Sequence, residues 1–296
     1  MALSGVGQKA RASMGFGVPA LSPGLPHKPR PCYVAPHATL AVLQRPAEFM
    51  LGSLTSRSHR GVMRARSPLR QVAENLWVAE RPQSFYALPV GTRMTVIRLT
   101  GERLLLHSPV VLDPELRAEL DSLGQVCFAV APNRVHHLHA GEVVQAYPGA
   151  RLWVAPGLER KRPDLVFEAV LTDEAPEEWR GEVDQVFFRG RPYENEVVFF
   201  HRASRTLVLC DLAFNFGSRA AAPTRLLMKL LRSYGRLGPS KLDPLLIRDR
   251  RAARESLERI LVWDFDRIIV AHGDVLEGGG HEILRKGYSW LLLPRG

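Results

Sequence analysis

Imidazole and carboxylate side chains occur directly after three apolar segments of this chain. They are His136, His137 and His139 after Val126–Ala131, Asp211 after Thr206–Cys210, and His272 after Arg267–Ala271. Imidazole nitrogens and carboxylate oxygens are common ligands of zinc, iron and manganese. The pattern therefore indicates a site for one divalent metal, although the chain contains neither an HxHxDH nor a CxxC motif.

Each of these groups also has a purely structural interpretation. The three closely spaced histidines could form the polar side of a helix start, and Asp211 could cap a turn. His272 precedes Gly273 and could stand in an ordinary turn. The long separations in sequence are no obstacle to a shared site, because the carboxyl ends of strands in an α/β sheet collect at one edge.

Several further polar residues are candidates for secondary roles or for replacement ligands. They are His107, Asn133, His139, His201 and Asn215. Asn133 could orient a ligand by hydrogen bonding or cap the following helix. His201 more simply packs or forms a hydrogen bond at a hairpin, and His107 ends an apolar segment.

Short apolar segments alternate with helical patterns from about residue 72. Expected strands are Asn75–Glu80, Met94–Leu99, Arg103–His107, Val126–Ala131, Leu152–Ala155, Gln185–Phe188, Val197–His201, Thr206–Cys210 and Arg267–Ala271. Expected helices are 113–124, with Asp113 as its cap, His136–Tyr147, Pro223–Ser233, Ile247–Trp263 and Glu282–Leu293. A short turn at Ala203–Ser204 predicts a hairpin. This order of elements predicts an α/β fold, of α+β character, with mixed sheets.

The positive charge of the chain is concentrated in its first part. Residues 1–70 carry ten Lys and Arg but a single acid, Glu48, whereas residues 71–296 carry thirty Lys and Arg and twenty-nine acids. A nearly neutral domain at 71–296 argues against a nucleic-acid-binding function. Residues 1–70, rich in proline and arginine, are expected to be a disordered extension. They could be a transit peptide, or the true start could be Met50 or Met63.

The remaining composition bears on location. No stretch approaches the ~18 consecutive apolar residues that a transmembrane helix requires. Three cysteines give no disulfide framework, so a reducing compartment is expected. The expected location is cytoplasmic, or plastid or mitochondrial if the extension is a transit peptide. Met228–Lys241 combines basic and leucine residues and could be a connecting helix, a lid or a membrane-surface contact.

Six stretches of the chain are similar to the DUF4336 family, which itself resembles a divergent branch of the metallo-β-lactamase superfamily. They are Arg93–Leu99, His107–Leu116, Ala131–His137, Phe200–Leu207, Cys210–Asn215 and Ala271–Asp274. The resemblance covers about residues 74–293. It implies a metallo-β-lactamase-like four-layer αββα sandwich with two mixed sheets and a metal site at one edge.

The resemblance also implies a reduced set of metal ligands. Where the superfamily has the first two histidines of HxHxDH, this chain has Pro132 and Arg134, and no histidine occurs near residues 190–192. Asp211 and His272 match later ligands. The implied ligand set of a single metal is His136, His137, Asp211 and His272, with Asp211 also the candidate catalytic carboxylate.

Three functions are compatible with these observations. The first is a one-metal hydrolase in which a metal-activated water attacks a small ester, thioester, lactone or phosphoester. The second is a non-catalytic binding or scaffolding protein, for which a site blocked by Arg134 would be a sign. The third is a non-haem iron oxidoreductase. The expected partner is a small-molecule substrate, with no nucleic acid and no transmembrane segment.

Overall fold

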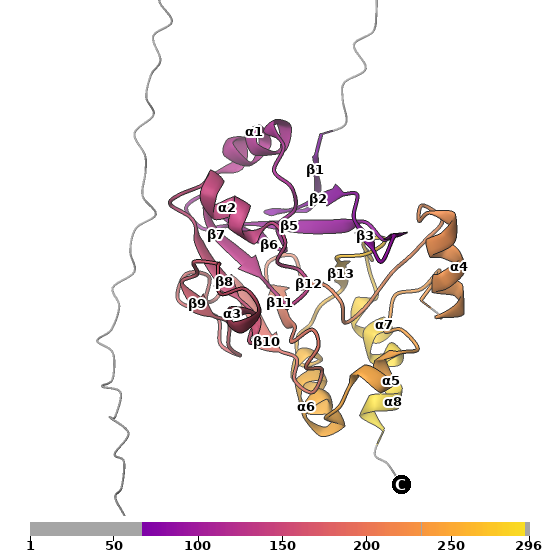
Figure 1. Cartoon of the computed structure of the whole chain (residues 1–296). Coiled ribbons are helices and arrows are strands. Elements are labelled where there is room, and N and C mark those ends of the chain that lie inside the picture. The colour runs from indigo at the N-terminus through magenta and orange to yellow at the C-terminus, as the bar shows by residue number, and fades with distance from the viewer. Residues whose placement is uncertain (1–66, 232, 294–296) are drawn as a thin grey trace, which may run out of the picture. The chain divides into compact units, whose positions relative to one another are not determined.

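Two mixed β-sheets pack face to face, and helices cover their outer sides (Figure 1). The computed structural model describes residues 67–231 and 233–293. The predicted four-layer αββα sandwich with two mixed sheets is confirmed. Residues 1–66, most of the expected extension, lie outside the described residues.

The larger sheet has seven strands, antiparallel on one side and parallel on the other. In spatial order they are β1 (Leu69–Ala73), β2 (Leu76–Arg81), β5 (Thr92–Leu99), β6 (Arg103–His107), β7 (Gln125–Ala131), β8 (Arg151–Val154) and β9 (Ala169–Val170). Pairing is antiparallel from β1 to β6 and parallel from β6 to β9. Strand β7 is apolar at six successive positions, as expected for a strand buried on both faces.

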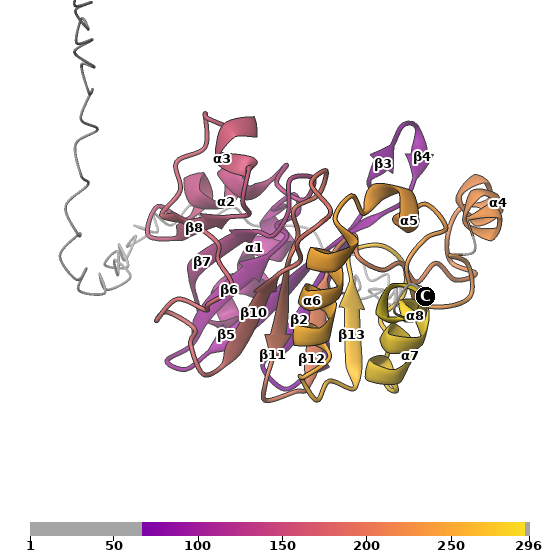
Figure 2. The same ribbon diagram turned by 90° about the horizontal axis from the view of Figure 1, so that it is seen from below.

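The smaller sheet brings two of the candidate residues side by side. Its strands are β10 (Val183–Phe187), β11 (Val197–His201), β12 (Thr206–Leu209) and β13 (Arg267–Val270), and β11 and β12 form the predicted hairpin. Strands β12 and β13 are parallel, with Leu209 opposite Val270. Asp211 and His272 each follow two residues later. A separate hairpin of β3 (Ser84–Phe85) and β4 (Leu88–Pro89) projects beyond this edge (Figure 2).

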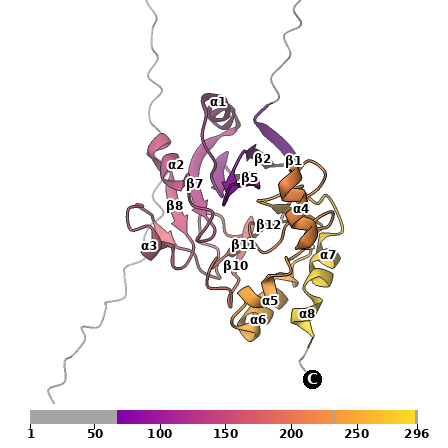
Figure 3. The ribbon, with the colours of Figure 1, turned by 45° about the vertical axis from the view of Figure 1, so that its right-hand side comes forward.

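The helices form the outer layers and part of the edge. Helices α1 (Pro114–Leu123) and α2 (Ala140–Ala146) pack on the larger sheet. Helices α6 (Arg250–Ile260), α7 (Gly280–Gly287) and α8 (Ser289–Leu292) cover the smaller one (Figure 3). The remaining helices are α3 (Leu158–Lys161), α4 (Ala222–Leu230) and α5 (Asp243–Leu246). Among the described residues, no helix has the length and apolar character needed to cross a bilayer.

Three apolar clusters hold the four layers together. Alternate residues of β6 point to opposite faces, so Leu104 and Leu106 pack beneath α1 and α2. Leu105 points to the other side and packs with Phe199 between the sheets. A third cluster lies beneath α6 to α8 and includes Leu257. Burial of an apolar side chain contributes about 1.5–3 kcal/mol, which makes these clusters the main source of stability.

Local signals in the sequence predict the start of one helix correctly and the start of another incorrectly. Asp113 caps α1 as expected, because its Oδ1 accepts the N–H of Leu116 over 2.8 Å. The helix predicted from His136 begins only at Ala140. Oδ1 of Asn133 accepts the backbone N–H groups of residues 135 and 136, and this bonding closes a turn where the helix was expected.

Candidate metal centre

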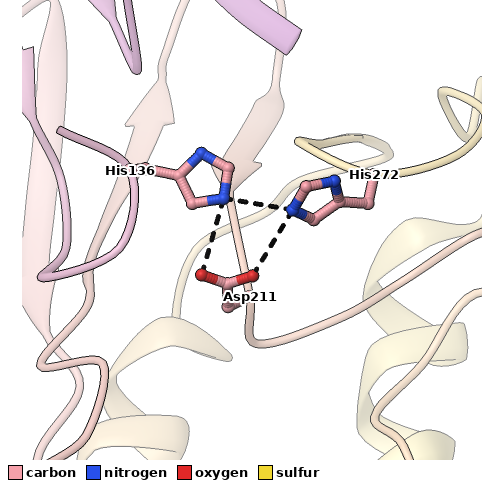
Figure 4. A group of neighbouring side chains, drawn as sticks. All are labelled: His136, Asp211 and His272. Atoms are coloured by element: carbon pink, nitrogen blue, oxygen red, sulfur yellow. Dashed lines mark hydrogen bonds and ion pairs between the residues drawn. The ribbon is translucent and has the colours of Figure 1, made fainter. Parts of the chain in front are cut away.

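His136, Asp211 and His272 meet at the edge of the sandwich (Figure 4). Nε2 of His136 lies 3.2 Å from Nε2 of His272 and 3.5 Å from Oδ2 of Asp211. Nε2 of His272 lies 3.7 Å from Oδ1 of Asp211. One ligand atom from each residue falls within 4.8 Å of the others, and the group draws on both sheets.

These distances match the requirements of a small divalent metal. Ligands held ~2.0–2.1 Å from a tetrahedral zinc ion lie about 3.3 Å from one another. The three separations in the group are 3.2, 3.5 and 3.7 Å. Two imidazoles and one carboxylate also leave a fourth position for water or substrate, as catalytic sites do. The residues therefore fit one metal ion.

The far ring nitrogens of both histidines have partners that orient the near ones. Nδ1 of His272 donates to the carbonyl oxygen of Gly91 over 2.7 Å, which leaves Nε2 as the unprotonated nitrogen facing the group. Nδ1 of His136 lies 2.9 Å from Oγ of Ser108. Partners of this kind orient metal-binding histidines and increase their basicity.

Burial and the Asp211 charge set the protonation of the group. Burial opposes protonation of His136, but the adjacent Asp211 carboxylate raises the pKa of this imidazole above its ordinary value. Burial, followed by the charge of His136, lowers the pKa of His272 to about 4. Burial alone would raise the pKa of Asp211, but His136 and then His272 hold it well below its usual range. Asp211 is therefore a stable anion.

Glu196 supports Asp211 from beneath and has no counterpart among the predicted site residues. Its Oε1 and Oε2 accept the backbone N–H groups of Cys210 and Asp211 over 2.6 and 2.7 Å. Nδ2 of Asn133 donates to Glu196 Oε2 over 3.2 Å. Complete burial, together with the Asp211 charge, raises the pKa of Glu196 to about 7. A carboxylate directly before the apolar strand β11 was the available signal.

Arg191 is the second residue that sequence reasoning missed. It lies in the 190–192 segment, where the family resemblance indicated a missing histidine. Nη1 of Arg191 donates to the backbone carbonyl of Asp211 over 3.0 Å and to Oδ2 of Asp243 over 3.2 Å. The guanidinium is almost fully buried, with a side-chain exposure of 3%. A cation of the chain itself thus lies beside the candidate metal centre.

The turn that carries His272 is fixed by neighbouring backbone. Gly273 has a φ of +96°, and a Cβ at this position would lie 2.2 Å from the carbonyl oxygen of Asn215, so glycine is required here. The N–H of Asn215 donates to the carbonyl of His272 over 3.2 Å. The buried guanidinium of Arg93 donates to the carbonyls of Val270 and Gly273.

The remaining predicted site residues lie outside this group. Nδ1 of His137 accepts a hydrogen bond from Arg162 over 3.0 Å, and His139 pairs with Glu142 over 2.9 Å. His107 is buried between the sheets, with its ring edge against Phe199. His201 binds Ser204, and its register opposite Thr206 places it at the other end of β12 from Asp211. His137 as a ligand stays a prediction.

A cavity of about 420 Å³ opens onto the candidate metal centre. The lining includes His136, Asp211 and His272, and it extends to the β3–β4 hairpin, α4 and α5. Most of the lining residues away from the centre are apolar. Arg134, which could have blocked the site, instead donates to the carbonyl of Pro192 and is not among the lining residues.

Solved structures share this fold at low sequence identity. A metallo-β-lactamase from Pontibacter korlensis has a TM-score of 0.53 and 12% identity, covering 76% of this chain and 99% of that chain. A metallo-β-lactamase from Erythrobacter litoralis has a TM-score of 0.52 and 15% identity, with 76% and 93% covered. The Flv1 flavodiiron core from Synechocystis sp. PCC6803 has a TM-score of 0.55 and 12% identity, with 75% and 60% covered.

Comparison by sequence finds fewer relatives than comparison by structure. No curated protein matches the chain. The family model described as DUF4336, a domain of unknown function, matches residues 73–230. That segment includes β2 to β12 and two members of the candidate metal centre, His136 and Asp211. The chain therefore belongs to the DUF4336 family and has the fold of the metallo-β-lactamases.

Proposed function

We propose that this protein is a hydrolase that uses one divalent metal held by His136, Asp211 and His272. The observation that carries the proposal is the convergence of two oriented imidazole nitrogens and an ionised carboxylate beside a cavity. The far nitrogen of each imidazole already has a hydrogen-bond partner. The group is therefore organised for binding before any ligand arrives.

In the proposed reaction, the metal ion and the side chains of the protein would have different roles. A bound zinc, iron or manganese ion would polarise the scissile group and activate a water molecule. Asn133 fixes Oδ2 of Asp211, so Oδ1 is the oxygen that can accept the proton of the attacking water. Arg191 reduces the local negative charge, since its guanidinium donates to the backbone carbonyl of Asp211.

The lining of the cavity limits which substrates can bind more than the metal ligands do. Side chains such as Phe85, Leu227 and Leu246 line it away from the candidate centre. Apolar surfaces of this kind bind the non-reacting part of a ligand, whereas a few polar groups orient it. The substrate is accordingly an ester, thioester, lactone or phosphoester with an apolar substituent.

The decisive measurement is metal content by elemental mass spectrometry on the full-length chain, purified without chelator or affinity tag. About one equivalent of zinc or manganese, with hydrolysis of nitrophenyl esters that improves as the acyl chain lengthens, is the expected result. No metal after reconstitution would instead indicate a non-catalytic binding or scaffolding protein. Iron with a redox-sensitive spectrum and no ester hydrolysis would indicate an oxidoreductase.

A further inference from the structure

Large apolar side chains on the β3–β4 hairpin, on α4 and in the segment 242–246 face solvent, and two of them, Phe85 and Leu242, also line the cavity. We refer to six of them as the apolar rim: Phe85, Tyr86, Leu226, Leu230, Leu242 and Leu245. The exposed fractions reach 89% for Tyr86 and 78% for Leu245. Single exposed apolar residues are ordinary, but a continuous group around a cavity marks an interaction site.

The three parts of the chain that carry the rim lie next to one another. Helix α4 packs against β4, and Oγ1 of Thr224 donates to the carbonyl of Pro89 over 2.6 Å. Phe85, Leu227 and Leu242 line the same cavity. The β3–β4 hairpin, α5 and α4 lie along the edge toward which β13 points (Figure 2).

Helix α4 exposes apolar side chains that an ordinary surface helix would bury. Thr224 and Met228 face inward, whereas Leu226 and Leu230 are 64% and 63% exposed. A surface helix of a globular protein normally presents polar residues to water. An exposed apolar face flanked by cations such as Lys229 is typical of helices that lie at a lipid interface.

The tip of the β3–β4 hairpin is also unusual for a protein surface, in both its backbone conformation and its residue types. Tyr86 and Ala87 have φ values of 46° and 65°, both positive, at the two central positions of the turn. Hairpin turns of this type favour Asn-Gly, because other residues are strained at positive φ. Here the strained turn presents aromatic side chains to solvent, which neither burial nor turn chemistry explains.

The positive charge of the segment between Asp211 and Asp243 indicates that the partner of the rim is anionic. Between Asp211 and Asp243 the sequence contains no acidic residue but six basic ones: Arg219, Arg225, Lys229, Arg232, Arg236 and Lys241. Of these, Arg219 pairs with Asp274 outside the segment. Basic residues beside exposed apolar ones favour a membrane surface that carries anionic lipids.

We propose that the apolar rim docks onto an anionic lipid bilayer surface and places the opening of the cavity against the acyl chains. The docking contact is peripheral and uses leucine and aromatic side chains together with the basic segment. The proposal stands on the rim itself and does not require the candidate metal centre. A membrane position would give the apolar cavity access to ligands that are sparingly soluble in water.

Vesicle sedimentation of the full-length chain tests the proposal. The probes are phosphatidylcholine vesicles with and without phosphatidylserine, each at low and high salt. The rim variant is Leu226→Glu with Leu230→Glu, and the matched control is Val166→Glu with Val262→Glu, whose side chains are also exposed, at 86% and 83%. We expect about tenfold weaker partitioning for the rim variant and none of this loss for the control.

The control separates the rim from the basic residues 1–70, since both variants retain that segment and high salt screens its attraction to anionic lipid. Equal partitioning of the two variants would overturn the proposal, as would a wild-type chain that binds neither vesicle. A dimer seen by light scattering that the rim variant dissociates, without vesicle binding, would make a second copy the occupant. Circular dichroism spectra of both variants that match the wild type would exclude misfolding. An unchanged metal content would show that the candidate metal centre is unaffected.

Discussion

Nδ2 of Asn133 donates a hydrogen bond to Oδ2 of Asp211 over 2.8 Å, and Oδ1 of the same side chain accepts the N–H of His136 over 2.6 Å. One amide thus fixes a carboxylate that follows the smaller sheet and the backbone of an imidazole that follows the larger one. Of the two roles considered for Asn133, the structure shows hydrogen bonding to a candidate ligand and closure of a turn in place of a helix cap.

Substitution of Asn133 is expected to weaken the metal centre without removing any ligand. Asn133→Ala deletes all four side-chain hydrogen bonds, to Glu196, Asp211 and the backbone N–H groups of residues 135 and 136. It should lower metal affinity about 10–100-fold, because partners of ligands contribute at this level. The free energy of unfolding should fall by about 1–3 kcal/mol. Competition with a fluorescent chelator and urea denaturation measure the two effects.

Asn133→Asp is the matched comparison, because it retains the acceptor that closes the turn but places a third carboxylate beside Asp211 and Glu196. In the absence of metal it should be less stable than Asn133→Ala. If instead the two variants bind metal as tightly as the wild type, Asn133 does not position the centre.

Removal of any member of the trio should abolish metal retention. His136→Ala, Asp211→Ala and His272→Ala each delete one of three converging ligand atoms. Elemental mass spectrometry should show metal below about one tenth of the wild-type stoichiometry. His139→Ala is the control, since this partly buried side chain lies outside the trio and pairs with Glu142. A trio variant that retains full metal would refute the assignment.

His137→Ala distinguishes a three-ligand from a four-ligand centre. The Nδ1 of His137 is already engaged by Arg162, and burial with the nearby Lys161 and Arg162 charges lowers the pKa of this imidazole to about 4. We expect metal stoichiometry to be unchanged. Loss of metal in this variant would restore His137 to the ligand set that the sequence predicts.

Glu196→Gln tests whether the strand end beneath Asp211 needs a carboxylate. Glutamine offers one oxygen where two backbone N–H groups now find acceptors, and its amide group would face one of these donors. We expect a loss of about 1–3 kcal/mol in the free energy of unfolding. The exposed Glu142→Gln should change this free energy by less than about 0.5 kcal/mol. Equal effects would argue against a supporting role.

His107 should make the fold sensitive to acid. Complete burial, followed by the charge of His136, lowers the pKa of His107 to about 3 from an ordinary 6.5. Between these values the unfolded chain binds a proton that the folded chain does not, so stability falls as pH drops from about 6.5 toward 3. His107→Leu should reduce this slope in urea denaturation series collected across that range.

His107→Leu also tests whether Nε2 of His107 has a hydrogen-bond partner. Within the described residues, Nε2 of His107 has no hydrogen-bond partner. Replacing such an atom by an apolar group of similar size should leave stability at pH 7 nearly unchanged or higher. A marked loss at pH 7 would show that Nε2 has a partner such as a replacement ligand role implies. A slope equal to that of the wild type would show that folding does not lower the pKa of His107.

The candidate ligands that follow strands could be predicted from the sequence, because the signal for them lies in neighbouring residues. A buried apolar strand followed by a ligand-type residue can be read within about ten positions, and this holds for Asp211 and His272. The hairpin of β11 and β12 was predicted for the same reason. The resemblance to DUF4336 added the layered arrangement, which the fold confirms.

The missed residues depend on contacts between distant segments. Glu196 and Arg191 reach Asp211 because β10, β11 and β12 pair, which brings the connection between β10 and β11 next to the end of β12. The β3–β4 hairpin has two-residue strands, too short for a periodic pattern. The direction of His137 follows from the turn closed by Asn133, which a helical pattern cannot reveal.

The two imidazoles reach the centre from opposite sheets, His136 after β7 and His272 after β13. The separation of their Nε2 atoms is therefore set by the thickness of the apolar layer between the sheets, where Phe199 and Val130 pack. If the centre holds a metal ion as we propose, substitutions in that layer would change which ionic radius fits it while every ligand stays the same. The metal preference of the proposed centre would then depend on residues that never touch the ion.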